Sequence, residues 1–233
     1  MDEQRGPRQF DVIVVGSGGG ALTGAALAAK AGLSVAVVEK TPLLGGTSAY
    51  SGGACWLPGS QVQQRAGISD STEGARAYLG AILEDPDSAK VEAFLSHAPE
   101  LVAELESDPD FDFEWLPFPE YYDAPGRVPF GRSIQPTNIK RDELHPLVSE
   151  LVRPPVELDR AGGSGRRTLS GGQSLIGRLA AIVVREGGTI LTSHTVVHLL
   201  TEGERVVGVR CTTGGDDDGA TELRAGRGVL IAA

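Results

Sequence analysis

A largely apolar run that breaks into glycines near the N-terminus constrains this chain more than any other feature. Residues Phe10 to Val15 are followed by Gly16-Ser17-Gly18-Gly19-Gly20-Ala21 and then by an alanine-rich stretch of helical character. This pattern predicts a strand, a tight turn and a helix. Gly16 permits the turn, Gly18 lets a phosphate approach the backbone, and Ala21 is small enough for helix and strand to pack closely. The helix N-terminus would offer unpaired N–H groups and a positive dipole end to an anion.

A second predicted strand ends on an acidic residue at the spacing that a nucleotide-binding βαβ unit requires. Ser34 to Val38 reads as this strand, and Glu39 follows it, 23 positions after Gly16. An acid about 20 residues after the glycines accepts hydrogen bonds from an adenosine ribose, which favours FAD or NAD over NADP. The alternative is a βαβ unit whose glycines only make a turn. We expect a dinucleotide-binding βαβ unit over residues 10–41.

The rest of the chain divides into three segments by composition and periodicity. We expect a glycine- and serine-rich loop over 42–59, a mainly helical or irregular insertion over 60–165, and a helix with a β-meander over 166–233. The expected helices are 71–83 with Ser69 or Asp70 as possible cap, 88–106, 144–151 and 175–186. The expected strands are 111–118, 189–193, 196–202, 205–212 and 222–225, with a hairpin turn at 214–219 and a buried strand at 227–233.

Charge and composition narrow the range of partners. The 233 residues carry a formal net charge of −10, which argues against nucleic acid and against a polybasic membrane contact. No apolar segment approaches the length of a membrane span, and the N-terminus lacks the apolar core of a signal peptide. Cys55 and Cys211 are the two cysteines, without metal-ligand spacing, so we expect buried thiols in the cytoplasm and no metal. Because the chain ends on an expected core strand, we also expect it to be part of a longer polypeptide.

With these motifs in place, the chain resembles the FAD-dependent fumarate reductase/succinate dehydrogenase flavoproteins, and within them the 3-ketosteroid Δ1-dehydrogenases. The likeness runs along essentially all of the chain but covers only the N-terminal half of the family's proteins. The residues that carry it are Val15 to Ala25, Gly45-Gly46-Thr47-Ser48-Ala49-Tyr50-Ser51-Gly52, Trp56-Leu57-Pro58-Gly59, Phe118-Pro119-Glu120-Tyr121-Tyr122, Gly131-Arg132-Ser133-Ile134 and Leu175-Ile176-Gly177-Arg178-Leu179.

The resemblance implies an α/β fold: a Rossmann-like FAD-binding domain with a parallel sheet, an antiparallel β-meander and a helical insertion. It also implies FAD contacts at matching positions. Gly16, Ser17, Gly18, Gly19 and Gly20 would wrap the pyrophosphate, and Glu39 would hold the ribose with Lys40 and Thr41 beside it. Gly46, Thr47, Ser48, Ser51, Gly52 and Gly53 would follow the ribityl chain and flavin, Val196 would meet adenine, and Ala232 would approach from the last strand. The histidine that binds flavin covalently in succinate dehydrogenases would fall at Gly46, so the FAD is expected to be non-covalent.

The implied reaction is a 1,2-desaturation beside a ketone, with α-proton abstraction by a base and hydride transfer to flavin N5. In the family the base and the oxyanion donors lie beyond Ala233, so the catalytic domain is expected to be absent from this chain. One supporting tyrosine matches Tyr121, which would hydrogen-bond to the base, and Tyr122 is the fallback. A packing role for this aromatic pair is the alternative.

Other candidates leave alternatives open. Trp56, Phe111, Phe113, Trp115 and Phe118 would either line an apolar pocket for a sterol or form core, and His97 is expected to be capped or partly buried. The parent protein would be a steroid Δ1-dehydrogenase, or a related flavoprotein acting on another enone or a fumarate-like acid. A third interpretation is an incomplete chain that binds FAD weakly or not at all and catalyses nothing.

Overall fold

The chain divides into two compact units. The computed structural model describes residues 8–84, 89–163, 165–213 and 220–233. The first unit joins Met1–Gly52 to Asn138–Ala233, and the second is Gly53–Thr137. The second unit is therefore shorter than the insertion expected over 60–165. It takes the end of the glycine-rich loop and leaves residues 138–165 to the first unit.

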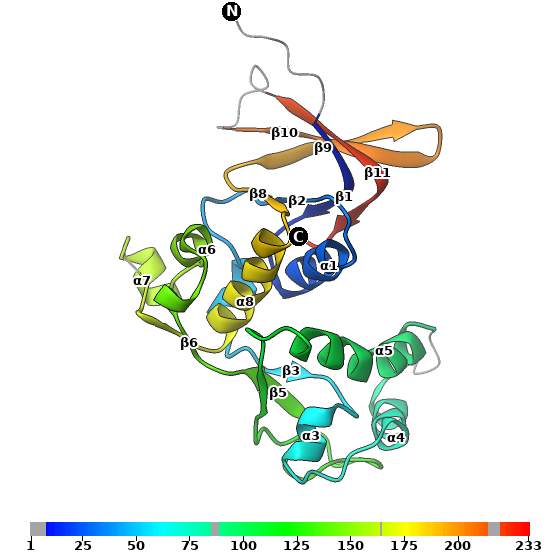
Figure 1. The fold of residues 1–233 in the computed structure, drawn as a ribbon. Coiled ribbons are helices and arrows are strands. Elements are labelled where there is room, and N and C mark those ends of the chain that lie inside the picture. Colours follow the sequence, from blue (N-terminus) through cyan, green and yellow to red (C-terminus); the bar gives the residue numbers. More distant parts are fainter. Residues whose placement is uncertain (1–7, 85–88, 164, 214–219) are drawn as a thin grey trace, which may run out of the picture. The chain divides into compact units, whose positions relative to one another are not determined.

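The first unit is built on a six-stranded mixed sheet in the order β8-β2-β1-β11-β10-β9 (Figure 1). Four strands run parallel: β8 (Thr189–Leu191), β2 (Val35–Val38), β1 (Arg8–Val15) and β11 (Thr221–Ile231). The strands β10 (Arg205–Thr212) and β9 (Thr195–Glu202) continue the sheet in antiparallel pairing. The expected α/β class, with a parallel sheet and an antiparallel meander, is thus confirmed.

The sheet differs from the expectation at two strands. The segment expected to open the meander is β8, which instead pairs in parallel with β2. The two strands expected at 222–225 and 227–233 are the single strand β11, which pairs with both β1 and β10. The end of β11 is also less buried than expected, because Leu230 is 38% and Ile231 is 60% exposed. The hairpin turn expected at 214–219 lies outside the described residues.

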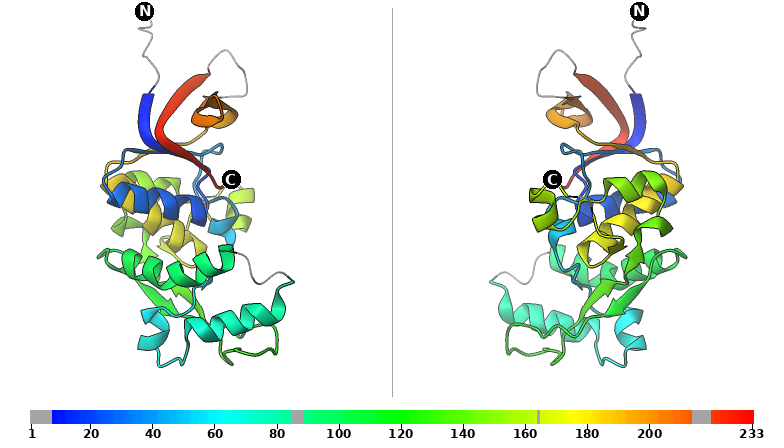
Figure 2. Two further views of the ribbon diagram at one scale, coloured as in Figure 1. Left: turned by 90° about the vertical axis from the view of Figure 1, so that its right-hand side faces the viewer. Right: turned by 90° about the vertical axis from the view of Figure 1, so that its left-hand side faces the viewer.

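Two helices pack side by side against the parallel strands (Figures 1 and 2): α1 (Gly19–Lys30) and α8 (Gly172–Arg185). The buried side chains of α1 include Ala21, Ala25 and Ala29, which are spaced four apart and so share one face. Small side chains on this face let the helix approach the sheet closely. The remaining elements of this unit are short: α2 (Gly46–Tyr50), β6 (Ile139–Lys140), the 3-10 turn η1 (Arg141–Glu143), α6 (Pro146–Leu151), α7 (Val156–Arg160) and β7 (Thr168–Leu169).

The second unit combines a small antiparallel sheet with three helices. The sheet has the order β3-β5-β4, with β3 (Cys55–Trp56), β5 (Ser133–Pro136) and β4 (Phe113–Trp115). The helices are α3 (Gln61–Arg65), α4 (Thr72–Ile82) and α5 (Ala89–Glu106). The cap of α4 is Ser71, whose hydroxyl accepts from the N–H of Gly74 at 3.0 Å, rather than Ser69 or Asp70. The extended segment expected over 111–118 forms a strand only at β4.

The structure also bears on the expectations for the thiols, a membrane span and a metal site. Cys211 is buried and Cys55 half-buried, both are free, and burial raises the pKa of Cys55 to about 11, so its thiol stays protonated at neutral pH. In the parts of the chain that the structure describes, no helix is both long and apolar enough to cross a bilayer. Nor do these parts hold a cluster of three or more His, Cys, Asp or Glu suited to a metal ion. The cytoplasmic location stays a prediction.

The first residue of α8, Gly172, must be glycine because it packs against α2 and the residue that follows it. A Cβ on Gly172 would overlap the carbonyl oxygen of Ser48, and the Gly172 N–H donates to the carbonyl of Ser51 at 3.0 Å. We therefore expect Gly172→Ala to lower the free energy of unfolding by about 3 kcal/mol, as overpacking does. The control is Gly228→Ala in β11, where a Cβ meets nothing within 4 Å and a small gain is expected. Denaturant unfolding measures both, and equal stabilities would contradict the close contact.

Candidate functional site

A cavity of about 420 Å³ lies in the first unit, where β1 and β2 end. It is lined by most of the residues predicted to bind a cofactor: Gly16, Ser17, Gly18, Glu39, Lys40, Thr41, Gly46, Thr47, Ser48, Val196 and Ala232. They come from five separate segments of the chain. The carboxyl ends of parallel strands are where ligands bind in open α/β sheets.

The other predicted cofactor residues do not line this cavity. Gly19 and Gly20 form the first turn of α1, and the Gly19 N–H donates to the Ser48 hydroxyl at 3.0 Å. Ser51 and Gly52 lie just after α2, while Gly53 belongs to the second unit. Contact of these five residues with a cofactor stays a prediction.

The two glycines Gly16 and Gly18, in the turn after β1, differ in what a side chain would meet. Gly16 has φ +99°, and a Cβ there would come within 2.8 Å of the Ala232 carbonyl oxygen, so the fold itself excludes a side chain. A Cβ on Gly18 would meet only the Ser48 hydroxyl, at 3.5 Å, which is an ordinary contact. No described group therefore requires glycine at this second position. A ligand that approaches the backbone closely would require it.

Glu39 is buried and accepts three hydrogen bonds from two residues, one of them from the Thr41 hydroxyl to Oε1 at 2.9 Å. Its Oε2 accepts from the Ser17 hydroxyl at 2.5 Å, and its Oε1 accepts from the Thr41 N–H at 2.8 Å. The Ser17 hydroxyl in turn accepts from the Gly45 N–H at 3.0 Å. A carboxylate has about four lone-pair sites, so Glu39 keeps accepting capacity for a ribose hydroxyl. Ser17, itself buried, orients the carboxylate through its side chain.

The sequence did not identify His194 and Thr195, which also line the cavity. They follow β8, and backbone bonds tie this segment to the end of β2: Ser193 N–H to the Thr41 carbonyl at 3.0 Å and His194 N–H to the Glu39 carbonyl at 2.9 Å. They were missed because the sequence analysis assigned this strand to the antiparallel meander. Parallel pairing of β8 with β2 places its carboxyl end at the same edge of the sheet.

The groups around the cavity suit an adenine dinucleotide. Backbone N–H groups at the start of α1 can meet a pyrophosphate, and a buried carboxylate can meet a ribose. Val15, Val38 and Val196 supply apolar surface. The residues present therefore fit FAD.

The second unit contains a separate pocket of about 370 Å³ with mainly aromatic and aliphatic walls. Tyr121 and Tyr122 line it and are 84% and 61% exposed. Its remaining walls are Ala54, Trp56, Tyr78, Leu79, Ile82, Phe118, Pro119, Glu120 and Ser133. Tyr78 was not identified from the sequence, where it reads only as a helix residue.

Of the aromatic residues that the sequence left undecided, Trp56 and Phe118 line this pocket. Phe111 and Phe113 are buried, with ring centroids 4.9 Å apart, and therefore belong to the core. The indole N–H of Trp115 donates to the Gly131 carbonyl at 3.2 Å. The expectation that His97 is partly buried was wrong, although its ring has the hydrogen-bonding partner that a capped histidine would have. Its side chain is exposed on α5, because it lies off the buried face, and its Nδ1 lies 2.8 Å from Glu100 Oε2.

Comparison with known proteins identifies the family of this chain. The family model described as FAD binding domain matches residues 11–233. A 3-oxosteroid 1-dehydrogenase of Rhodococcus opacus is 46% identical over 200 residues, which cover 86% of this chain and 39% of that protein. The chain thus spans less than half the length of this relative.

Solved structures agree with the fold. A 3-ketosteroid Δ1-dehydrogenase from Sterolibacterium denitrificans, in complex with 1,4-androstadiene-3,17-dione, matches with a TM-score of 0.80 and 28% identity, covering 97% of this chain and 48% of that chain. A flavocytochrome c3 fumarate reductase shares the fold with a TM-score of 0.60 and 22% identity, covering 97% and 34%. The resemblance read from the sequence is confirmed.

The position of Ser17 between Glu39 and Gly45 predicts an indirect effect on the cofactor. Ser17→Ala removes one donor from Glu39, and we expect the FAD dissociation constant to rise about five-fold, equivalent to about 1 kcal/mol. The chemically matched control is Ser96→Ala on the exposed face of α5. Titration of the complete natural polypeptide with FAD measures both variants, and a Ser17→Ala affinity equal to that of the control would remove Ser17 from the site.

Proposed function

The chain belongs to the family of FAD-binding domains, and we propose that it is the N-terminal, flavin-binding part of a 3-ketosteroid Δ1-dehydrogenase. The observation that carries this proposal is the 46% identity to a 3-oxosteroid 1-dehydrogenase over 86% of this chain. The apolar, aromatic pocket of the second unit supports it, since a ring system without charges suits such walls. The catalytic domain, with the main base, would lie outside this chain.

In this proposal the first unit holds FAD by the groups around its cavity. The start of α1 meets the pyrophosphate, Glu39 the ribose, and the backbone at Val196 the adenine. FAD, when bound, supplies the acceptor for the two electrons of a hydride. The cofactor is held without a covalent bond, because the position of the flavin-linked histidine is Gly46, which has no nucleophilic side chain.

The reaction removes a proton from the carbon beside the ketone and a hydride from the next carbon, which leaves a 1,2-double bond. A tyrosine base is nearly all neutral at pH 7, so it needs a neighbour that lowers its pKa or relays its proton. We assign this supporting role to Tyr121. Its exposed side chain leaves the hydroxyl accessible to a partner. Tyr122 is the second choice.

The alternative activity, on another enone or a fumarate-like acid, is less favoured. A fumarate-like substrate carries carboxylates that need cationic or hydrogen-bonding partners. None of the described residues that line the pocket is cationic, and the one charged residue among them, Glu120, is already paired with Arg132.

The role of Tyr121 is tested on the complete natural polypeptide loaded with FAD. Wild-type enzyme is expected to convert a 3-ketosteroid into a product lacking two hydrogens. Tyr121→Phe is expected to lower kcat at least about ten-fold, since acid–base support contributes on this scale or more, with FAD content unchanged. Tyr122→Phe is the matched comparison, and product analysis by mass spectrometry gives the rates. A loss of kcat in Tyr122→Phe alone would transfer the role, and unchanged kcat in both variants would remove this aromatic pair from the mechanism.

A further inference from the structure

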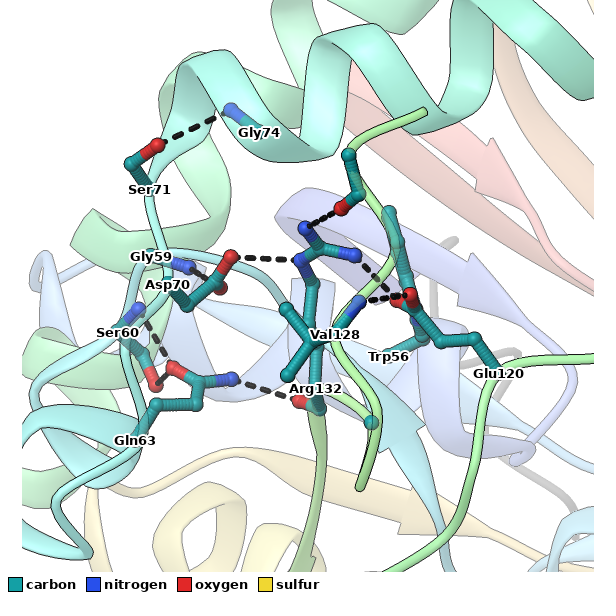
Figure 3. A network of polar contacts seen from close by, with 12 residues as sticks. Trp56, Gly59, Ser60, Gln63, Asp70, Ser71, Gly74, Glu120, Val128 and Arg132 are labelled. Atoms are coloured by element: carbon teal, nitrogen blue, oxygen red, sulfur yellow. Dashed lines mark hydrogen bonds and ion pairs between the residues drawn. The ribbon is translucent and has the colours of Figure 1, made fainter. Parts of the chain in front are cut away.

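Arg132 is a charged side chain at the centre of the second unit, and Figure 3 shows it between two acids. Its side chain is 1% exposed. Nε donates to Asp70 Oδ1 at 2.6 Å, Nη1 is paired with Glu120 Oε1, and Nη2 donates to the Gly126 carbonyl at 2.5 Å. The guanidinium also lies 5.7 Å from the ring centroid of Trp56 and 5.8 Å from that of Tyr78. Each of the three guanidinium nitrogens thus has a partner.

The acidic partner Glu120 is fixed by further donors. Its Oε1 accepts from the Trp56 indole N–H at 3.0 Å, and its Oε2 accepts from the Val128 N–H at 2.8 Å (Figure 3). Glu120 and Gly126 therefore attach one segment of chain to Arg132 directly, and Val128 is attached through Glu120.

This segment, residues 118–131, contains no helix or strand. Its two ends meet, because Gly131 has φ +82° and a Cβ there would overlap the Phe118 carbonyl oxygen. Such a loop lacks a ladder of backbone bonds, so its side chains and their partners determine its course. Here the partners are the buried charges, together with the Tyr78 hydroxyl, which accepts from the Tyr122 N–H at 3.2 Å.

Arg132 is anchored on its other side to the helices. Asp70 accepts from the Gly59 N–H at 2.8 Å, and Gln63 Nε2 donates to the Arg132 carbonyl at 2.6 Å (Figure 3). The network thus connects the turns beside α3 and α4 to the loop. A buried ion pair adds little net stability compared with apolar packing. Removing one partner is costly, however, so the paired charges keep the segments that carry them in fixed positions.

Tyr121 follows Glu120 directly and has the opposite environment. The Glu120 side chain is buried in the network, whereas Tyr121 stands on the pocket side with its ring edge against Phe118, at a centroid distance of 5.8 Å. Among the described residues, no hydrogen bond holds the Tyr121 side chain. Its backbone is held on either side, by the buried Glu120 and by the Tyr122 N–H that donates to Tyr78.

We propose that Arg132 and Glu120 are positioning residues for Tyr121 in the dehydrogenation. This inference rests on the proposed function. Neither residue touches the substrate. They fix the Tyr121 backbone, and through it the place from which the phenol reaches the catalytic base.

A double-mutant cycle separates positioning from a general structural effect. Glu120→Gln keeps the size and one accepting oxygen but removes the charge that pairs with Arg132. In the complete FAD-loaded polypeptide we expect it to lower kcat roughly ten-fold, because small misplacements of a reacting group are costly. In the Tyr121→Phe background the same change should alter kcat less than two-fold, since the residue through which Glu120 acts is already disabled.

The controls keep the test decisive. Asp123→Asn removes an exposed charge from the same loop, where Asp123 lies 3.4 Å from Arg127, and should leave kcat and KM unchanged. If Glu120→Gln does not fold, the cycle is repeated with Arg132→Lys, which keeps the positive charge but loses the forked hydrogen bonds of the guanidinium. FAD content is measured for every variant.

The outcomes are distinct. If the losses of kcat from the two single variants multiply in the double variant, the inference is overturned. It is also overturned if the variants at Glu120 and Arg132 both fail to incorporate FAD. Either result would mean that the network supports only the general stability of the protein. Wild-type activity with no effect of Glu120→Gln would overturn the inference but keep the proposed function. A wild-type enzyme that does not desaturate 3-ketosteroids would overturn the proposed function, and the inference with it.

Discussion

The hydroxyl of Ser17 lies between the carboxylate of Glu39 and the N–H of Gly45, and the candidate cofactor site depends on this contact. It connects the turn after β1, the end of β2 and the loop that leads into α2. Each of these segments contributes backbone or side-chain groups to the same cavity. A buried carboxylate needs such donors, because an unpaired buried charge is costly. The same donors that stabilise Glu39 also fix its free lone pairs for a ligand.

Local chemistry made the first part of this site predictable. The glycine run after an apolar segment and the acid after the next strand predicted β1, α1, β2 and the positions of Gly16 and Glu39. The reason is that turn geometry and helix packing constrain residues a few positions apart. The mixed sheet was less predictable, because strand pairing is a long-range property. Nothing near β8 indicates that it pairs with β2, and nothing near residue 226 indicates that β11 continues through it. His194 was missed for this reason.

The second unit was the least predictable from sequence. Its loop carries Tyr121, whose importance came from family likeness and not from periodicity. The partnership of Arg132 with Asp70 and Glu120 spans 62 and 12 positions, so no local pattern reveals it. The sequence suggested Asp70 only as a possible helix cap, and it placed Glu120 and Arg132 only within motifs of the family likeness. Only the fold shows that they are buried, and that they fix a loop without regular secondary structure.

The most direct measurement is a crystal structure of the complete natural polypeptide with FAD and a 3-ketosteroid. The account predicts the pyrophosphate at the start of α1, Glu39 Oε2 about 3 Å from a ribose hydroxyl, and Tyr121 facing the base beside the ketone ring. A dinucleotide bound elsewhere, or with Glu39 turned away from the ribose, would contradict the account of the site. A steroid bound far from Tyr121 would contradict the proposed role of that residue.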